Sequence, residues 1–271
     1  MSRPTILKLG GELLEHPDQM RALAASIAAI ARRVPLVVIH GGGREIDAEL
    51  AKAGIPKHQV DGIRVTDEAT LAVVIPVLAG TVNTRFVAAI AAAGGQAVGL
   101  TGADVGVCPV EAAPPMRTAA GDTVSLGLVG QPVNDGVPHL LHHLLAGRYV
   151  PVVASIAADK AGALFNVNAD TIAGALAERL WAERLVIAGT TAGVMDPDGV
   201  TISELGELAE QRLVESGAAN AGMLAKLRAC RTALRSGVGS VLIVNGRDAS
   251  RLESAVLKGE SPDGSLTKVV P

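Results

Sequence analysis

The stretch that decides the fold is Pro35-Leu-Val-Val-Ile-His-Gly-Gly-Gly43. Its uninterrupted apolar run is typical of a strand that is buried on both faces. The three glycines end that strand, and a helical pattern resumes over 44–53. The same arrangement occurs earlier, because the β-like run Thr5–Leu9 stops at Gly10-Gly11 and a helical pattern follows over 18–33. The chain therefore begins with two units of strand, glycine turn and helix.

This alternation continues along the chain. Short apolar runs predict strands over Gln96–Leu100, Tyr149–Ala154, Arg184–Ala188 and Ser240–Val244. Apolar residues at helical spacing predict helices over 67–93, with a kink or division at Pro76, and over 137–147, 168–181, 205–216 and 221–236. Turn residues predict hairpins over 106–135 and 191–203. Strands that alternate with helices imply right-handed crossovers and one mostly parallel sheet between helical layers.

Composition sets the broad class of the protein. Of the 271 residues, 49% are hydrophobic and 19% are charged, which supplies a sizeable core and excludes intrinsic disorder. At roughly 100–200 residues per domain, this length allows one large domain or two small lobes. The net charge of −3 and the aromatic share of 1% argue against nucleic acid as a partner.

The cysteines and the N-terminus bear on the compartment. Cys108 and Cys230 are isolated in sequence, so they indicate neither a disulfide framework nor a zinc site. The N-terminus has no apolar stretch long enough for a signal peptide. No window approaches the ~18 uninterrupted apolar residues of a membrane span. The sequence therefore predicts a cytoplasmic protein without a membrane partner.

Two glycine clusters are candidates for binding phosphate. The chain has no P-loop and no Gly-x-Gly-x-x-Gly after a strand. Lys8-Leu-Gly10-Gly11 places a cation beside a turn that lacks Cβ atoms, and His40-Gly-Gly-Gly43 precedes a helix whose first amides could face an anion. Both clusters follow predicted parallel strands, and open α/β sheets bind ligands at that end. Either cluster alone is equally well explained as a tight turn.

Three further segments carry candidate residues. Arg64 follows a turn glycine and could grip a carboxylate with its planar guanidinium, although a surface arginine is the commoner case. Asn166-Val-Asn168-Ala-Asp170 puts three short polar side chains before a predicted helix, where a cap explains one of them. Lys226 lies on a helical stretch on which a solvated lysine is the commoner case. The histidines of 139–143 lack carboxylates at metal-site spacing, so no metal site is expected.

Taken in order, these segments resemble the amino acid kinase family, and within it the acetylglutamate kinases. The shared motifs are Lys-x-Gly-Gly at 8–11, His-Gly-Gly-Gly at 40–43, Gly-x-Arg-Val-Thr at 62–66, Asn-Val-Asn-Ala-Asp at 166–170 and Gly-Met-x-x-Lys at 222–226. Lys-x-Gly-Gly alone is shared widely in the family, whereas the Gly-x-Arg-Val-Thr and Asn-Val-Asn-Ala-Asp motifs are specific. The match runs from residue 5 to the end of the chain.

The resemblance implies a three-layer αβα sandwich around a mostly parallel sheet. Residues 1–167 would form an N-terminal lobe that binds the acceptor and dimerises, and residues 168–271 a C-terminal lobe that binds ATP, on one continuous sheet. Resembling enzymes that arginine inhibits carry a helix before the first strand and form hexamers. Only four residues precede Thr5, too few for such a helix, so we expect a homodimer that is insensitive to arginine.

The implied reaction transfers the γ-phosphoryl group of ATP to the side-chain carboxylate of N-acetyl-L-glutamate, a step of arginine biosynthesis. By position, Lys8 and Lys226 would stabilise the transferring group, and Asp170 would hold both lysines. The residues implied to bind acetylglutamate are Gly42, Gly43, Arg64 and Asn166, and those implied to bind the nucleotide are Gly10, Gly11, Thr190, Gly193 and Met223. Mg²⁺ would be held mainly by the phosphates of ATP, without a metal ligand from the protein. A carboxylate acceptor is already ionised at pH 7, so this chemistry depends on positioning and charge neutralisation rather than on a general base.

Two departures from the family pattern lie on the nucleotide side. Gly189-Thr-Thr-Ala-Gly193 lacks the aspartate that family members commonly have in this stretch. Near Lys226, Ala221 and Ala225 stand where a glycine and a proline are usual. These departures bear on nucleotide affinity more than on recognition of the acceptor.

Two alternative functions remain open. One is a kinase of a related acceptor, such as aminoadipate or glutamate linked to a carrier protein. A carrier would favour more basic residues near the acceptor pocket than Lys57 and His58. The other is a catalytically silent amino-acid sensor, against which the presence of Lys8, Asp170 and Lys226 argues.

Overall fold

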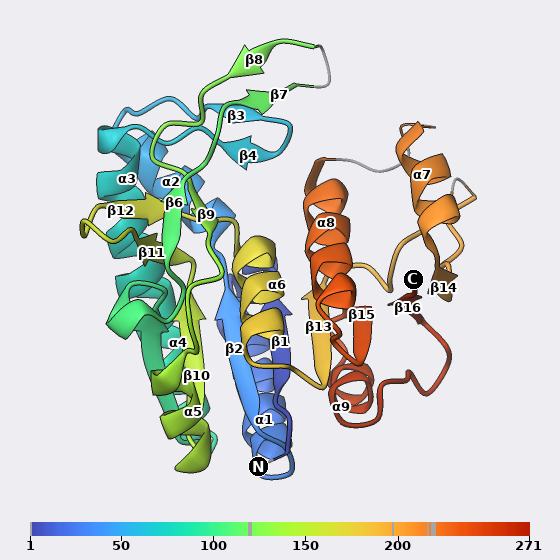
Figure 1. The fold of residues 1–271 in the computed structure, drawn as a ribbon. Helices are drawn as coiled ribbons and strands as arrows, with labels where there is room; N and C mark the ends of the chain where they lie inside the picture. The colour runs from blue at the N-terminus through green and yellow to red at the C-terminus, as the bar shows by residue number, and fades with distance from the viewer. Residues whose placement is uncertain (1, 119–120, 197, 216, 218–220) are drawn as a thin grey trace.

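The computed structural model describes residues 2–118, 121–196, 198–215, 217 and 221–271 (Figure 1). Within these residues the chain builds an eight-stranded central sheet in the order β14-β16-β15-β13-β1-β2-β10-β5. Its strands are β1 (Thr5–Leu9), β2 (Leu36–His40), β5 (Ala97–Thr101), β10 (Val150–Ala154), β13 (Arg184–Gly189), β14 (Glu204–Leu205), β15 (Ser240–Asn245) and β16 (Leu266–Val269). Neighbouring strands are parallel except β15 and β16. The expected mostly parallel sheet is confirmed.

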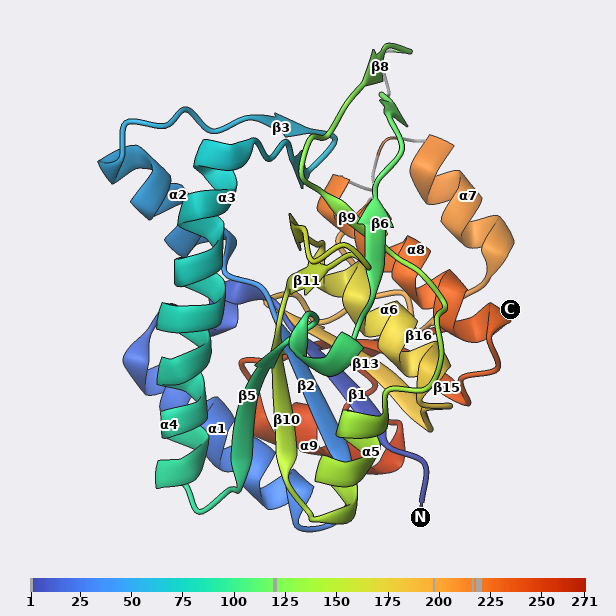
Figure 2. The same cartoon turned by 60° about the vertical axis from the view of Figure 1, so that its left-hand side comes forward.

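Helices cover both faces of this sheet (Figures 1 and 2). The described helices are α1 (Pro17–Ala31), α2 (Gly43–Lys52), α3 (Glu68–Ile75), α4 (Asn83–Ala92), α5 (His139–Ala146), α6 (Ala169–Arg179), α7 (Glu207–Glu215), α8 (Ala221–Arg235) and α9 (Ala249–Lys258), with short 3₁₀ turns η1 (Gly11–Leu13) and η3 (Asp104–Gly106). Because side chains alternate along a strand, Leu7 of β1 enters the core under α1, α4 and α9, whereas Ile6 enters the core under α5, α6 and α8. This double burial explains why β1 and β2 lack polar alternation.

The helical segment predicted over 67–93 is continuous in space. Between α3 and α4 the chain forms the π-helix η2 (Pro76–Val82), which begins at Pro76. Because proline has no N–H to donate to an α-helical hydrogen bond, the helix changes type at Pro76. The predicted kink or division at Pro76 thus takes the form of a π-helix in a continuous helical segment. The whole helix, Glu68–Ala92, is long and apolar enough to cross a membrane by length and composition alone, with a mean hydropathy of 1.7. Core helices pass the same test, and one face of this helix, including Val82 and Phe86, is buried against the sheet and α1.

Short hairpins stand over the carboxyl ends of the sheet strands (Figure 1). They pair β3 (Gln59–Val60) with β4 (Ile63–Arg64), β6 (Val110–Ala112) with β9 (Gly130–Pro132), β7 (Met116–Arg117) with β8 (Thr123–Val124) and β11 (Ile156–Ala158) with β12 (Leu164–Asn166). The hairpins expected over 106–135 are confirmed, and the bridge between Met195 and Thr201 confirms the turn expected over 191–203. Residues 119–120, Pro197 and Ser216, which belong to predicted elements, lie outside the described residues.

Candidate active site

The two glycine turns meet at the carboxyl ends of β1 and β2. These strands are parallel neighbours, with Leu9 opposite His40. A Cβ atom on Gly11 would lie 2.9 Å from the Cα atom of Gly42. A Cβ atom on Gly42 would in turn lie 2.9 Å from Cδ2 of Leu78. The turns therefore approach each other more closely than residues with side chains permit, so a group bound at one turn is next to a group bound at the other.

A buried ion pair lies beside this contact. Nζ of Lys8, near the end of β1, is 2.9 Å from Oδ1 of Asp170, and both side chains are 7% exposed. Asp170 stands in the first turn of α6, where Asn168 caps the helix by accepting hydrogen bonds from the amides of Asp170 and Thr171. Apart from the Lys8 ammonium, Oδ1 of Asp170 meets no hydrogen-bond partner in the part of the chain that the structure describes. That oxygen can therefore accept a second cationic group.

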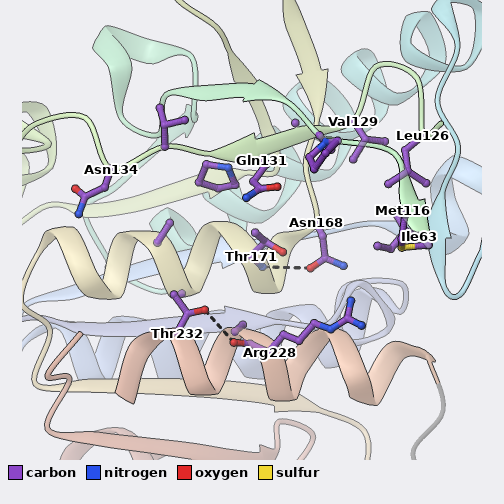
Figure 3. Close-up of a pocket in the computed structure, with 18 of the residues that line it drawn as sticks. Ile63, Met116, Leu126, Val129, Gln131, Asn134, Asn168, Thr171, Arg228 and Thr232 are labelled. Carbon is purple, nitrogen blue, oxygen red and sulfur yellow. Dashed lines mark hydrogen bonds between the residues drawn. The ribbon is translucent and has the colours of Figure 1, made fainter. Parts of the chain in front are cut away.

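Lys226 comes from α8, which lies along α6 (Figure 3). The two helices touch where a Cβ atom on Gly174 would be 3.1 Å from the carbonyl oxygen of Ala229. One turn back from that contact, towards the start of each helix, are Asp170 and Lys226. Within the described residues Asp170 forms an ion pair with Lys8 and none with Lys226. Of the two candidate lysines, Lys8 thus forms an ion pair with Asp170 in this structure, and Lys226 does not.

Cys230 reports the charges near this helix pair. Burial raises the pKa of its thiol, the negative charge of Asp170 raises it further, and the positive charge of Lys226 opposes the rise. The thiol is completely buried. Both charged groups are therefore within electrostatic reach of the same point between α6 and α8.

Arg64 stands at the other side of the glycine turns. Its Nη2 atom donates to the carbonyl oxygen of Gly43 at 3.4 Å and contacts Oδ1 of Asp47 on α2. Its Nη1 atom is buried and, among the described residues, has no acceptor. The N-cap of α2 is Gly42, which has no side chain to occupy the first amides of the helix. An unpaired guanidinium nitrogen beside a bare helix N-terminus is suited to bind a carboxylate.

Asp47 is a site residue that sequence reasoning missed. Burial opposes its ionisation, but hydrogen bonds from Lys57, at 2.7 Å, and from Arg64 outweigh that effect and lower the pKa of the carboxyl. The ionised carboxylate can therefore hold Arg64 over a wide pH range. Nothing local in the sequence marks this pair, because Asp47 and Arg64 are 17 residues apart.

Asn166 joins the same region from β12. Its Nδ2 atom donates to Oγ1 of Thr66 at 3.1 Å, and the Thr66 hydroxyl donates to the carbonyl oxygen of Arg64 at 3.2 Å. A Cβ atom on Gly127, whose φ is +69°, would be 2.4 Å from the carbonyl oxygen of Thr66. Glycine is thus needed at 127 for two reasons: its backbone is left-handed, and the backbone of Thr66 approaches it closely. Arg64, Thr66 and Asn166, from two sequence motifs, form one hydrogen-bonded cluster.

His40 supports the second glycine turn from below. Its ring is fully buried, with Nδ1 3.0 Å from the carbonyl oxygen of Gly41 and Nε2 3.0 Å from Nδ2 of Asn83. Because the amide nitrogen of Asn83 can only donate, Nε2 accepts and the proton resides on Nδ1. Burial lowers the pKa of His40 to about 4, against the opposing effect of the Gly41 hydrogen bond. This neutral histidine ties the glycine turn to α4, and the sequence alone indicated neither contact.

The residues expected on the nucleotide side are arranged around β13 and α8. Thr190 directly follows β13, the sheet neighbour of β1, and Met223 lies half-buried in the first turn of α8. A Cβ atom on Gly193 would be 2.4 Å from Oγ1 of Thr267, so close packing against β16 accounts for this glycine. The amide of Gly10 donates to the carbonyl oxygen of Ala188 at 2.9 Å and is occupied within the sheet.

Two further features limit where ligands can bind. A pocket of about 430 Å³ lies between α6, α8 and β9, with Asn168 and Thr171 along one wall and Val129 opposite (Figure 3). Its described lining includes Asn168 and Ile63, so it adjoins the site built here, although Lys8, Arg64 and Asp170 do not line it. Among the described residues no three His, Cys, Asp or Glu side chains gather as a metal site.

Comparison with known proteins agrees with this architecture. Residues 3–245 match the model of the amino acid kinase family. An acetylglutamate kinase from a Synechococcus species is 37% identical over 99% of this chain and 84% of its own length. Another, from a Caulobacter species, is 39% identical over 89% of this chain and 83% of its own length.

A solved structure is similar over nearly the whole chain. The N-acetylglutamate synthase of Neisseria gonorrhoeae, determined with coenzyme A and N-acetyl-glutamate, superposes with a TM-score of 0.82 at 26% identity. The match covers 99% of this chain but only 59% of the synthase chain. The resemblance seen in the motifs is thus confirmed by family model, relatives and fold: the chain belongs to the amino acid kinase family.

Proposed function

We propose that this protein is an acetylglutamate kinase, which transfers the γ-phosphoryl group of ATP to the side-chain carboxylate of N-acetyl-L-glutamate in arginine biosynthesis. The observation that carries the proposal is the unpaired Nη1 atom of Arg64 beside the bare start of α2, next to the contact of Gly11 with Gly42. Arg64 and the α2 amides bind the α-carboxylate end of the acceptor. The acceptor's side-chain carboxylate then extends towards the first glycine turn. Full-length relatives that bear this name support the assignment.

Catalysis in this proposal is electrostatic. The acceptor carboxylate attacks phosphorus directly, and no residue has to remove a proton. Lys8 and Lys226 neutralise the charge that develops on the transferring oxygens, and the amides at the start of η1 add hydrogen bonds. Asp170 keeps the Lys8 ammonium oriented through the 2.9 Å ion pair. Asn166 holds the remaining polar groups of the acceptor, and the buried Thr66 hydroxyl positions its side chain.

The divalent cation that normally accompanies ATP would add positive charge at the phosphate oxygens. No protein cage exists for it among the described residues, because no cluster of three acidic or imidazole groups is formed. In this proposal the phosphates supply most of its ligands, as is usual for Mg²⁺ in phosphoryl transfer.

The lobe assignment and the oligomeric state belong to the same proposal. Residues 1–167 form the acceptor lobe and residues 168–271 the nucleotide lobe, on one sheet. β5 is at the edge of that sheet, and Val98 and Leu100 on it are half-buried. Beside it, the helix Glu68–Ala92 has only 39% of its most apolar window buried. A two-fold association that covers this edge and this helix would join two N-terminal lobes into a homodimer. We place this homodimer in the cytoplasm.

A coupled assay of ADP release with acetylglutamate, glutamate and aspartate tests the proposed function. Acetylglutamate should be the preferred acceptor, because free glutamate carries an ammonium group where the acetamide binds. Comparable kcat/KM for glutamate and acetylglutamate would contradict the acceptor assignment. A carrier-linked acceptor is disfavoured by geometry, since Lys57 is already paired with Asp47.

A further inference from the structure

Glu12 has an unusual place at the carboxyl end of β1. It lies in the first turn of η1, and its Oε1 atom is 2.3 Å from the position that a Cβ atom on Gly10 would take. The same oxygen is 3.7 Å from the corresponding position on Gly189. β1 and β13 are neighbouring parallel strands, with Leu9 opposite Ala188. The Glu12 carboxylate therefore lies across the ends of both strands.

This carboxylate has no cationic partner among the described residues. Within the part of the chain that the structure describes, Glu12 makes no hydrogen bond and no ion pair. The nearest cation along β1, Lys8, is already paired with Asp170. By contrast, Glu15 three residues later pairs with Arg44 at 2.9 Å. An unpaired carboxylate is ordinary on an open surface but not beside a turn that receives phosphate.

The proposed function makes the position of Glu12 chemically demanding. If the triphosphate of ATP lies along Gly10, Gly11 and the residues after β13, its oxygens approach the Glu12 carboxylate. Two anionic groups in contact repel each other unless a cation lies between them. Mg²⁺ prefers oxygen ligands and is commonly bound by one or two carboxylates together with substrate phosphates. Glu12 supplies one such carboxylate, and no second acidic ligand is needed.

We propose that Glu12 is a protein ligand of the divalent cation that enters with the nucleotide, bound either directly or through one water molecule. This inference rests on the proposed function, since it requires nucleotide phosphates at the first glycine turn. It adds a metal-binding role to a residue that the family motifs leave unassigned. It also distinguishes two ways of binding ADP, because Glu12 attracts the metal complex and repels the metal-free nucleotide.

The test measures binding of ADP by titration calorimetry to the wild-type protein, to Glu12→Gln and to the charge-matched control Glu111→Gln. Glu111 lies exposed on β6, where it pairs with Gln131 of β9. Each protein is titrated once in excess Mg²⁺ and once in a chelator. Binding of Mn²⁺ in the presence of ADP, followed by electron paramagnetic resonance of the free ion, gives a second readout that does not depend on activity.

We expect Glu12→Gln to weaken binding of Mn²⁺ to the ADP complex roughly 10-fold or more. Metal-free ADP should bind equally well or more tightly, since a repulsive charge is lost. Glu111→Gln should match the wild-type protein in both titrations. Weaker binding of the Mg²⁺ complex of ADP without weaker binding of metal-free ADP distinguishes a metal ligand from a packing effect, which would weaken both.

Three results would overturn the inference. Unchanged Mn²⁺ affinity in Glu12→Gln excludes the metal contact. Tighter binding of ADP both with and without Mg²⁺ identifies Glu12 as a simple electrostatic barrier. Equal weakening of both identifies a packing role. If the wild-type protein binds no ADP in either condition, the proposed nucleotide site fails instead, so the two failures are distinguishable.

Discussion

Asp47 holds Arg64 through one nitrogen and leaves the other free: Nη2 contacts the carboxylate, whereas Nη1 is buried without an acceptor among the described residues. Leaving a buried donor of a charged group unpaired costs free energy, of the order of 1–3 kcal/mol or more. A ligand carboxylate removes that cost when it binds. The guanidinium is thus oriented by the protein for an anion that the protein does not supply.

Replacing Arg64 by Lys should raise KM for acetylglutamate roughly 10- to 100-fold, with a smaller effect on kcat. Lysine keeps the charge but cannot contact Asp47 and a ligand carboxylate as a planar fork. Steady-state kinetics with acetylglutamate as the varied substrate measures the change. Arg44→Lys is the control, because Arg44 is exposed and pairs with Glu15. An unchanged KM in Arg64→Lys would remove Arg64 from the acceptor site.

Lys226→Ala should lower kcat about 10²–10³-fold with little change in stability. Lys226 is half-buried and makes no ion pair among the described residues, so its loss leaves no buried charge behind. Turnover and urea unfolding of the same preparation measure both effects. If kcat remains within a few-fold of the wild-type value, Lys226 does not act on the transferring phosphoryl group.

Lys8→Ala should differ from Lys226→Ala in stability. Removal of Lys8 leaves the buried carboxylate of Asp170 unpaired, which costs about 3–5 kcal/mol of unfolding free energy. The double variant Lys8→Ala/Asp170→Asn should recover part of that stability but none of the lost turnover. Recovery of turnover in the double variant would mean that Lys8 serves only to neutralise Asp170.

Gly11→Ala should reduce both stability and turnover. The added methyl group meets the backbone of Gly42, which has no flexible end to move aside, so about 1–3 kcal/mol of strain is expected. Gly80→Ala is a suitable control, since a Cβ atom at 80 meets nothing within 4 Å in the described structure. Thermal unfolding and kcat are measured for both. Equal behaviour of the two variants would show that the contact of the turns is not tight.

His40 predicts acid sensitivity. Its pKa is about 4 in the folded state and near 6.5 in the unfolded chain, so the unfolded chain takes up the proton first as pH falls. Stability from this group is complete above pH 6.5 and is lost progressively towards pH 4, by about 3 kcal/mol in total. Urea unfolding at pH 7 and pH 4.5 measures the loss. His40→Asn should be less stable at pH 7 but should lose less between the two pH values, and an unchanged pH dependence would contradict the prediction.

The sequence predicted most of the sheet because β1, β2, β10, β13 and β15 are buried on both faces and leave long apolar runs. It did not predict α9, although Asp248 caps that helix by accepting from the Arg251 amide and Gly259 ends it with φ +80°. Leu252, Ala255 and Val256 follow helical spacing on its buried face, so the signal for this helix is present in the sequence together with both caps. The hairpin of β11 and β12 was also missed, because strands of three residues are too short to show alternation.

The candidate site residues also fall into two groups: those that lie in sequence motifs, and those that are recognised only through contacts with residues distant in sequence. Candidates carried by motifs, such as Lys8, Arg64 and Asp170, could be predicted from their order along the chain. Asp47 and Asn83 act through partners 17 and 43 residues away, and no local pattern reports such pairing. Glu12 directly follows the first motif in sequence. Its carboxylate is seen to lie across the ends of β1 and β13 only when the sheet places Gly189 beside Gly10. The sequence therefore predicted most elements, but it did not predict the side-chain contacts between them.

The reactivity of the buried Cys230 thiol can be used to measure local opening of the protein. Burial suppresses the thiolate, so alkylating reagents can modify this cysteine only when α8 moves away from the core that it packs on. The labelling rate therefore measures how often that helix pair opens. Ligands that draw Lys226 and Asp170 together should slow the modification. The buried thiol of Cys108, which is within electrostatic reach of Arg179, provides an internal reference for global unfolding.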